Sequence, residues 1–509
     1  MQMDIDTQTV QNNTDIVVAS ISAAQLFSEQ SIKADNGSLI QGQLNLPEYQ
    51  RPYRWSFDDV KSLLSDISAY CDVRTDKKPM LYMGSVVLHQ QYDDEANTYI
   101  LNIIDGQQRI TTLQLICMAI EAKQGGEQFN LPAMEYASPV SHERIAKNYE
   151  WVLQQLGSQA YSDSLSKLDL SFINFTLVVT YSEDEAYRFF ETQNTGGVRL
   201  TGPQVIKAHH LRAIPNELQS DLARKWESFN HLDDVVDRLL KARRWQAFNF
   251  KNVPSYRAPE GVKKVIVTEF AKKSGNAADD MAFSRGAQNQ SISGYISQQI
   301  ISGYLAKQPL NAGVNTVNYF DYFSLLYQNI LVDQSSPYLT EFYCFYNKVV
   351  KESNNSNFLT EFYDIAILLY VSEFGTEKLI EAAYWIARCV FSIRLHNKKT
   401  VREDSIPAWI EKQLIFDWIS TAYQHQQLIN QLRAYHYEIS PDNIGINESG
   451  TDKTNTVKHK FIKGLADYFE INVLNLKGSQ LAEDFDRQLQ NAIASKLTNL
   501  KEHNKEVLV

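Results

Sequence analysis

A five-residue turn between two apolar runs constrains the fold of this chain more than any other feature. Residues 105–109, Asp-Gly-Gln-Gln-Arg, follow a strand-like run over 99–104 and lead directly into a helix-like run. A helix that begins in this way offers unpaired N–H groups and a partial positive charge, so we expect it to bind a phosphate. Arg109 adds a planar set of donors, Gly106 admits close backbone approach, and Asp105 is suited to capping the helix or positioning a metal ion or water. An ordinary Asp-Gly turn is the alternative interpretation.

The segment just upstream, residues 46–55, contains two arginines, three aromatic residues and two prolines in ten positions. The prolines favour an extended backbone. A helix is predicted to begin after Ser56, because Ser56 and Asp59 have the spacing of a capping box. We expect Arg51 to contact the ligand and the aromatic residues to pack in the core, with stacking on a nucleobase as the alternative for the aromatic residues.

A third polar segment follows a predicted buried strand over residues 175–180. Ser182 and Thr201 each begin a capping-box pattern and therefore predict helix starts. Between them, Asn194 precedes a Gly-Gly pair, which is a common way for a helix to end. The Asn194 carboxamide is also suited to holding a phosphate, a water molecule or a metal ion beside an arginine.

Three patterns occur in order across residues 20–250: P-x-Y-Q-R-x-Y-x-W, then D-G-Q-Q-R-x-T-T-L, then F-x-x-x-N-x-x-G-x-x-L-T-x-x-x-x-x-K. Together they resemble the ParB/sulfiredoxin-like NTPase domain. That domain forms the N-terminal part of GmrSD-type modification-dependent restriction enzymes and of the phage-defence protein SspE. Three ordered patterns are far more specific than any one of them.

The resemblance implies an α+β domain over residues 19–250 that binds and hydrolyses a nucleoside triphosphate with Mg²⁺ or another divalent cation. Arg109 and the amides of residues 110–112 would neutralise phosphate charge, and Asp105 would hold Mg²⁺ or orient the attacking water. Arg51 would clamp the phosphates from the opposite side. The catalytic residues are expected to be Asp105, Gln108, Arg109 and Asn194, and the nucleotide-binding residues Gln50, Arg51, Gly106, Gln107, Ile110, Thr111, Thr112 and Gly197.

The ten histidines do not assemble an HNH nuclease site, in which a histidine beside an asparagine or a second histidine activates water at a divalent metal. None of them begins the His-Ile-x-Pro pattern expected of that nuclease. Because the relatives couple nucleotide turnover to such a nuclease, we expect a separate HNH nuclease subunit. The four cysteines are scattered and form no C-x-x-C pattern, so neither a zinc site nor a disulfide framework is predicted.

The net charge of −11 argues against a chain that coats nucleic acid indiscriminately. Local DNA contact is expected at two basic runs, for which solvated helix faces are the alternative. No run is long enough to span a bilayer, no signal peptide is recognised, and free cysteines suit a cytoplasmic protein. The DNA-binding residues expected in the two basic runs are Lys241, Arg243, Arg244, Lys398 and Lys399.

Residues 1–18 contain few apolar side chains and are predicted to be disordered. A hairpin is predicted to pair residues 81–89 with 99–104. Beyond about residue 182 the patterns are nearly all helical, so residues 251–509 are expected to form an α-helical domain that senses a signal or docks a partner. Helices are predicted there over residues 319–332, 358–374, 378–395 and 408–433, the last directly after Pro407.

Together these features predict the NTP-hydrolysing component of a bacterial anti-phage defence system, coupled to DNA sensing or to a separate nuclease. The expected partners are a nucleoside triphosphate, DNA, the nuclease subunit and a second copy of the chain. Two alternatives stay open. In one, the turn holds a DNA backbone, as in a ParB-like DNA-binding protein or nuclease. In the other, the chain is a non-catalytic subunit that uses nucleotide as a switch.

Overall fold

A computed structural model describes residues 16–506, except residues 75–79, 95, 183–184, 187–200, 272–278, 293–294, 398–400, 448 and 474–475. The chain divides into two compact units. Unit 1 comprises residues up to 200 together with 216–227, and unit 2 comprises residues 201–215 together with 228–509. The main division therefore falls near residue 200, whereas the sequence predicted a boundary at 250. The predicted disordered segment also extends too far, because residues 17 and 18 begin the first strand.

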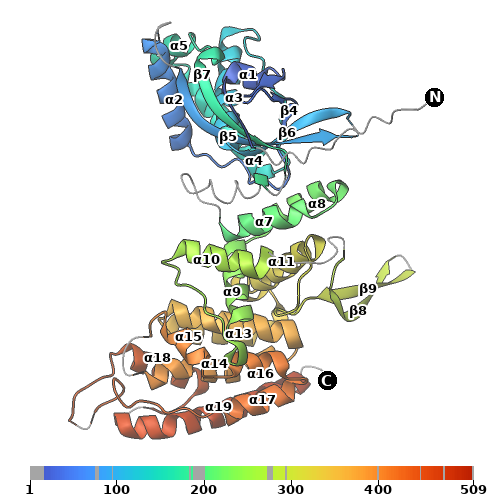
Figure 1. Ribbon diagram of the computed structural model, residues 1–509. Coiled ribbons are helices and arrows are strands. Elements are labelled where there is room, and N and C mark those ends of the chain that lie inside the picture. The colour runs from blue at the N-terminus through green and yellow to red at the C-terminus, as the bar shows by residue number, and fades with distance from the viewer. Residues whose placement is uncertain are drawn as a thin grey trace. The chain divides into compact units, whose positions relative to one another are not determined.

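Unit 1 is built around a five-stranded sheet with the order β1-β7-β5-β6-β4 (Figure 1). Its strands are β1 (Val17–Ser22), β4 (Gln43–Asn45), β5 (Leu81–Asp93), β6 (Thr98–Asp105) and β7 (Ile173–Thr180). β5 pairs with β6 antiparallel and with β7 parallel, which puts β5 at the centre of the sheet. The predicted hairpin and the predicted strand at 175–180 are thus both confirmed. A separate two-stranded sheet pairs β2 (Ile32–Lys33) with β3 (Leu39–Ile40).

Unit 1 also contains helices, several of which pack against this sheet. They are α1 (Ala23–Phe27), α2 (Phe57–Val73), α3 (Gln107–Gln124), α4 (Pro139–Gln155), α5 (Gln159–Leu165) and α8 (Asn216–Glu227). The start of α2 is as predicted: Ser56 accepts a hydrogen bond from the Asp59 amide, and the Asp59 carboxylate accepts one from Ser56 N. One side of α3 joins the core formed by the sheet, through Ile110, Leu113 and Ile116, all fully buried. That packing fixes where the first turn of α3 lies relative to β6.

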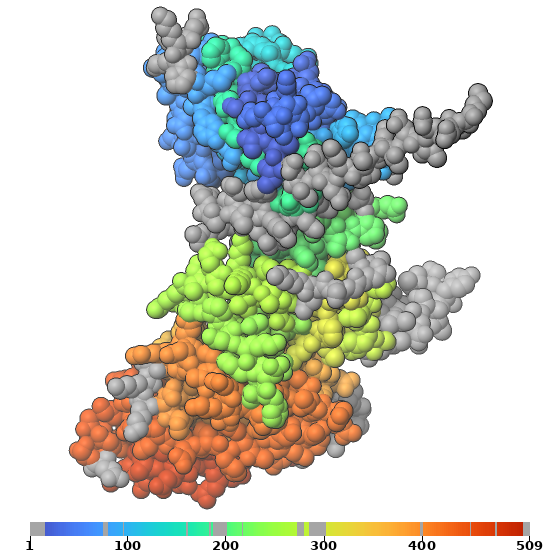
Figure 2. Space-filling model, viewed as in Figure 1, coloured from blue at the N-terminus to red at the C-terminus, as the bar shows by residue number. Residues whose placement is uncertain are grey.

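Unit 2 is mainly helical, as expected (Figure 1). Its centre is aromatic, with Phe345, Tyr363 and Tyr384 among the fully or almost fully buried side chains. In the space-filling view, the residues after about 400 gather at one end of this unit (Figure 2). The helices are α7 (Gly202–Arg212), α9 (Leu232–Arg244), α10 (Pro259–Ile266), α11 (Val314–Tyr327), α12 (Thr340–Phe345), α13 (Asn357–Phe374), α14 (Leu379–His396), α15 (Ser405–Ile410), α16 (Ile415–Thr421), α17 (His425–Ala434), α18 (Val457–Phe469) and α19 (Gly478–Glu506).

Two expectations for unit 2 are wrong in detail. The helix predicted over 408–433 is divided into α15, α16 and α17, and it begins at Ser405, before Pro407. Proline is tolerated there because it lies in the first turn, where no N–H is needed. A hairpin, β8 (Phe283–Ile292) with β9 (Tyr295–Gly303), also interrupts the helices. Its polar, glycine-containing sequence gives little alternation of apolar residues, so it was not predicted.

Among the described residues, no helix is both long enough and apolar enough to cross a membrane.

Candidate functional site at the start of α3

The backbone between β6 and α3 has the geometry of an anion site. Gly106 is the N-cap residue with φ of 103°, and the first helical bond runs from Ile110 N to Gly106 O at 3.0 Å. A β-carbon on Gly106 would lie 2.9 Å from Val86 Cγ2, so both the backbone angle and the space require glycine. Within the described residues no side chain caps this helix, and Asp105 does not do so. The N–H groups of residues 107–109 are therefore offered to a ligand or to water.

Gln107 is the most unusual side chain of the site. It is only 4% exposed, yet neither its amide nitrogen nor its amide oxygen has a hydrogen-bond partner among the described residues. Burying an unpaired amide costs about 1–3 kcal/mol, so such groups are rare in folded proteins. A side chain kept in this state at a helix N-terminus is suited to bind a ligand or an ordered water.

Gln108 has a different environment, because its amide is already occupied. Its Oε1 accepts hydrogen bonds from Arg54 N at 2.9 Å and Trp55 N at 3.2 Å, and its Nε2 donates to Pro52 O at 3.3 Å. These bonds attach the 50–55 loop to the start of α3. Gln108 thus holds the loop that carries Arg51, and its expected catalytic role stays a prediction.

The Arg109 guanidinium is also hydrogen-bonded within unit 1. Its Nη1 donates to Met83 O at 2.6 Å and its Nη2 donates to Ser85 O at 2.7 Å, while the Asp105 carboxylate lies 3.6 Å from Nη2. The two carbonyls flank Gly84, where the pairing of β5 with β7 shifts register. Gly84 has φ of 92°, and a β-carbon there would collide with Arg109 Nη1. Arg109 therefore fastens α3 to the bulge in β5, and Gly84 makes room for it. No pattern in the sequence marks Gly84 as part of the site.

The 50–55 loop brings a second arginine to the site. Gln50 is buried and donates from Nε2 to Ile104 O at 3.0 Å, which fixes the loop beside the end of β6. Burial lowers the pKa of the Arg51 guanidinium, and it is opposed by the nearby Asp105 carboxylate and reinforced by Arg54. Arg51 and Asp105 are thus close enough to interact electrostatically. This proximity is compatible with the expected position of Arg51 opposite the turn.

The hydroxyl groups of Thr111 and Thr112 are both hydrogen-bonded within unit 1. Thr112 is fully buried, and its hydroxyl donates to Gln108 O at 2.8 Å and bonds the Tyr53 hydroxyl at 2.7 Å. The Thr111 hydroxyl bonds Tyr136 at 2.8 Å. The Ile110 N–H is already bonded to Gly106 O within the helix, so the amides of residues 107–109 are better placed than that of Ile110 to meet a phosphate.

The basic run predicted to contact DNA is engaged inside unit 2. Lys241 Nζ bonds Asp237 Oδ2 at 2.6 Å and also contacts Glu361. Arg243 and Arg244 both pair with a single carboxylate, that of Glu269, at 2.8 and 3.6 Å. These cations are therefore not presented as an exposed patch.

Four further expected site residues lie outside the described residues, so the structure gives no account of them. They are Asn194 and Gly197 of the nucleotide site and Lys398 and Lys399 of the second basic run.

Asp105 is the residue of this site that could contact a divalent cation. Across the described ranges no group of three or more histidine, cysteine or carboxylate side chains is arranged to hold a metal ion. Asp105 is a single carboxylate, 29% exposed, and it lies beside a guanidinium. Mg²⁺ is commonly held by one or two carboxylates together with substrate phosphates. Asp105 is thus suited to a cation that arrives with a nucleotide.

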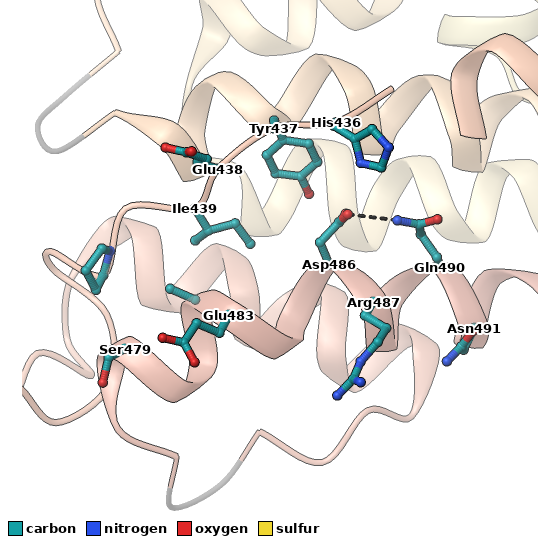
Figure 3. A pocket seen from close by; sticks show the side chains of 12 residues that line it. His436, Tyr437, Glu438, Ile439, Ser479, Glu483, Asp486, Arg487, Gln490 and Asn491 are labelled. Atoms are coloured by element: carbon teal, nitrogen blue, oxygen red, sulfur yellow. Dashed lines mark hydrogen bonds between the residues drawn. The ribbon is translucent and has the colours of Figure 1, made fainter. Parts of the chain in front are cut away.

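Unit 2 has a cavity of its own, about 590 Å³, between residues 436–441 and one face of α19 (Figure 3). Its wall includes Asp486, which accepts a hydrogen bond from Gln490 at 2.8 Å. Asp486 also receives two bonds from the buried Arg388, from Nε at 2.7 Å and from Nη2 at 2.6 Å. The carboxylate is thereby used to hold α19 against α14, which is a structural role.

Comparison with known families agrees with the division of the chain. Residues 24–211 match the GmrSD restriction endonuclease, N-terminal domain. Residues 218–448 match a family of unknown function, DUF7834. No curated protein matches the chain. The two matches meet close to the change from mixed α/β to mainly helical structure. The N-terminal part of this chain, residues 24–211, is thus a restriction-type domain of the GmrSD N-terminal family.

Proposed function

We propose that unit 1 binds and hydrolyses a purine nucleoside triphosphate, and that the chain is the NTP-driven component of a bacterial anti-phage restriction system. The observation that carries the proposal is the Gln107 amide, which is buried at the N-terminus of α3 and has no hydrogen-bond partner or side-chain cap beside it among the residues that the structure describes. Open N–H groups and a positive helix end favour phosphate. A buried amide beside them can bind a phosphate oxygen or hold the water that attacks it.

In this proposal the chain contributes charge and position. The N–H groups of residues 107–109 and the Arg51 guanidinium would neutralise negative charge on the terminal phosphate, which is the main requirement of phosphoryl transfer. Gln107 would orient the attacking water, and Asp105 would hold the Mg²⁺ that accompanies the nucleotide. That ion supplies further neutralisation of phosphate charge. Water would replace the nucleoside diphosphate on the terminal phosphorus, releasing inorganic phosphate and a proton.

Arg109 and Gln108 support the reaction without contacting the nucleotide in this scheme. Gln108 keeps Arg51 opposite the turn by holding its loop, and Arg109 fixes the first turn of α3 to the sheet. We further propose that nucleotide turnover is coupled to DNA sensing, and that DNA cleavage belongs to a separate nuclease. The restriction-type family of unit 1 supports this coupling.

The decisive experiment uses Gln107→Leu in the full-length chain. Leucine keeps most of the volume and removes an amide that bonds to none of the described residues, so the fold should be unchanged or more stable by about 1 kcal/mol. Phosphate release from each NTP with Mg²⁺, with and without modified or unmodified DNA, should fall at least tenfold. Gln124→Leu, at the exposed end of the same helix, is the matched control and should retain turnover.

Each outcome has a distinct meaning. Full turnover by Gln107→Leu would contradict the assignment of the site to the first turn of α3. Absence of turnover by the unaltered protein under every condition would contradict the hydrolase proposal. Nucleotide binding without turnover would then indicate a switch, and salt-sensitive DNA binding without nucleotide binding would indicate a ParB-like DNA-binding protein.

A further inference from the structure

A surface groove of about 510 Å³ lies in unit 1 between α3, α4 and the connection that joins them. Its floor includes Leu115, which is buried, and its rim includes Met118, which is 47% exposed. Met134 comes from the connection, while Ala146 and Tyr149 come from α4. The lining is thus dominated by aliphatic, thioether and aromatic groups. Its volume lies in the range of about 300–1,000 Å³ that is typical of small-molecule sites.

The polar groups at the floor of the groove are already satisfied. The Thr111 hydroxyl bonds the Tyr136 hydroxyl at 2.8 Å, and Gln114 Nε2 donates to Pro132 O at 2.8 Å. These bonds hold the connection between α3 and α4 in place as one wall. What the wall presents is therefore a preformed apolar surface, which suits a flat, weakly polar group better than a charged one.

The groove lies along the same face of α3 as Gln107 of the proposed phosphate site. Residues 107, 111, 114 and 118 are spaced by four, three and four positions, so they lie along one face of α3. Gln107, with its unpaired amide, is at the start of this face, and Thr111 and Gln114 line the groove. At a rise of ~1.5 Å per residue, Gln114 lies about 10 Å along the helix from Gln107. That separation is on the scale of a nucleotide lying extended along the helix.

We propose that this groove binds the base of the nucleoside triphosphate whose phosphates lie at the first turn of α3. The inference rests on the proposed function of that turn. The base would lie against the α4 side, where Tyr149 offers an aromatic ring and Ala146 leaves space. Affinity would then come from two separate ends of one ligand: charge at residues 107–109 and apolar contact in the groove. Because the Thr111 hydroxyl and the Gln114 amide nitrogen are already bonded and most of the remaining lining is apolar, the contact would favour a large base over a small one more than one purine over the other.

The test uses Ala146→Phe, which fills the groove from an exposed position of α4. Calorimetric titration of the full-length chain with Mg²⁺ would compare two probes, GTP and inorganic tripolyphosphate, which has no base. The variant should bind GTP at least tenfold more weakly and bind tripolyphosphate as the unaltered protein does. Glu150→Phe, an exposed site on the same helix that does not line the groove, is the control and should bind both probes normally.

The outcomes separate the two proposals. Unchanged GTP affinity in Ala146→Phe, with both probes binding the unaltered protein, would overturn the groove as a base site and leave the phosphate site standing. Equal losses for both probes would overturn it as well, because the effect would then lie at the phosphate end. Failure of the unaltered protein to bind either probe would overturn the phosphate site itself, and the groove inference with it.

Discussion

Replacing Gly84 with alanine tests whether Arg109 holds α3 against β5. Gly84 has φ of 92°, and a β-carbon there would occupy the place of Arg109 Nη1. Arg109 Nη1 would have to move, and it would then lose its bond to Met83 O. We therefore expect Gly84→Ala to loosen the centre of the sheet, although the residue is neither charged nor part of the turn.

The size of the effect follows from two separate costs. A left-handed backbone angle costs an alanine about 1–2 kcal/mol. Loss of one hydrogen bond to a charged group adds about 1.5–3 kcal/mol. Gly37 provides a matched control, since it has φ of 89° in unit 1 and a β-carbon there would meet nothing within 4 Å. Gly37→Ala should thus show the first cost alone, and Gly84→Ala should exceed it by about 1.5–3 kcal/mol.

Amide hydrogen exchange of the full-length chain measures this difference locally, in peptides from β5 and β6. One factor of ten in exchange corresponds to about 1.4 kcal/mol. Exchange in β5 should therefore rise about ten- to a hundredfold more in Gly84→Ala than exchange around residue 37 rises in Gly37→Ala. In an Arg109→Ala background the extra cost should disappear, because there is no guanidinium to displace. Equal effects of the two glycine substitutions would refute the argument that Arg109 is seated against Gly84.

Two further predictions concern interactions inside unit 1 and inside unit 2, respectively. Gln108→Ala removes the hydrogen-bond acceptor of two loop amides, Arg54 N and Trp55 N, so the loop should be released. The rate of tryptic cleavage after Arg54 should then rise several-fold. An unchanged rate would contradict the positioning role of Gln108. In unit 2, burial and the neighbouring Asp237 raise the pKa of Glu361 to about 7. The folded state then binds the Glu361 proton more tightly than the unfolded state does. The contribution of this protonation to the free energy of unfolding is therefore complete below the ordinary glutamate pKa and is lost as pH rises through 7. Urea unfolding between pH 4.5 and 8 should show this decline in the unaltered protein and a smaller one in Glu361→Gln; parallel curves would contradict the raised pKa.

The local features of the fold could be predicted because their causes are local. The β5–β6 hairpin follows from two apolar runs around a polar turn, and the start of α2 follows from Ser56 and Asp59, three residues apart. The start of α3 follows from Gly106 after an apolar strand. In each case the residues that determine the structure are neighbours in the chain, so tertiary contacts did not have to be known.

The orientation of long polar side chains could not be predicted, because it depends on distant backbone. Arg109 faces inward since a bulge in β5, about 25 residues earlier, offers it two carbonyl groups. The basic run at 241–244 was expected to meet DNA, yet Lys241 bonds Glu361, which is 120 residues away in sequence. Charge patterns give the composition of a helix face, but the partner of each charge is set by the tertiary fold.

The turn at 105–109 therefore divides into residues that build the site and residues left available for a ligand. Gln108 bonds the 50–55 loop and Arg109 bonds β5, whereas the Gln107 side chain has no hydrogen bond within the described part of the chain. Loss of activity in Arg109→Ala or Gln108→Ala would thus follow from a disturbed scaffold as readily as from a lost catalytic group. Gln107→Leu avoids this ambiguity, because its effects on stability and on activity are expected to have opposite signs. Among the residues of the turn, Gln107 is the one whose substitution reports on chemistry alone.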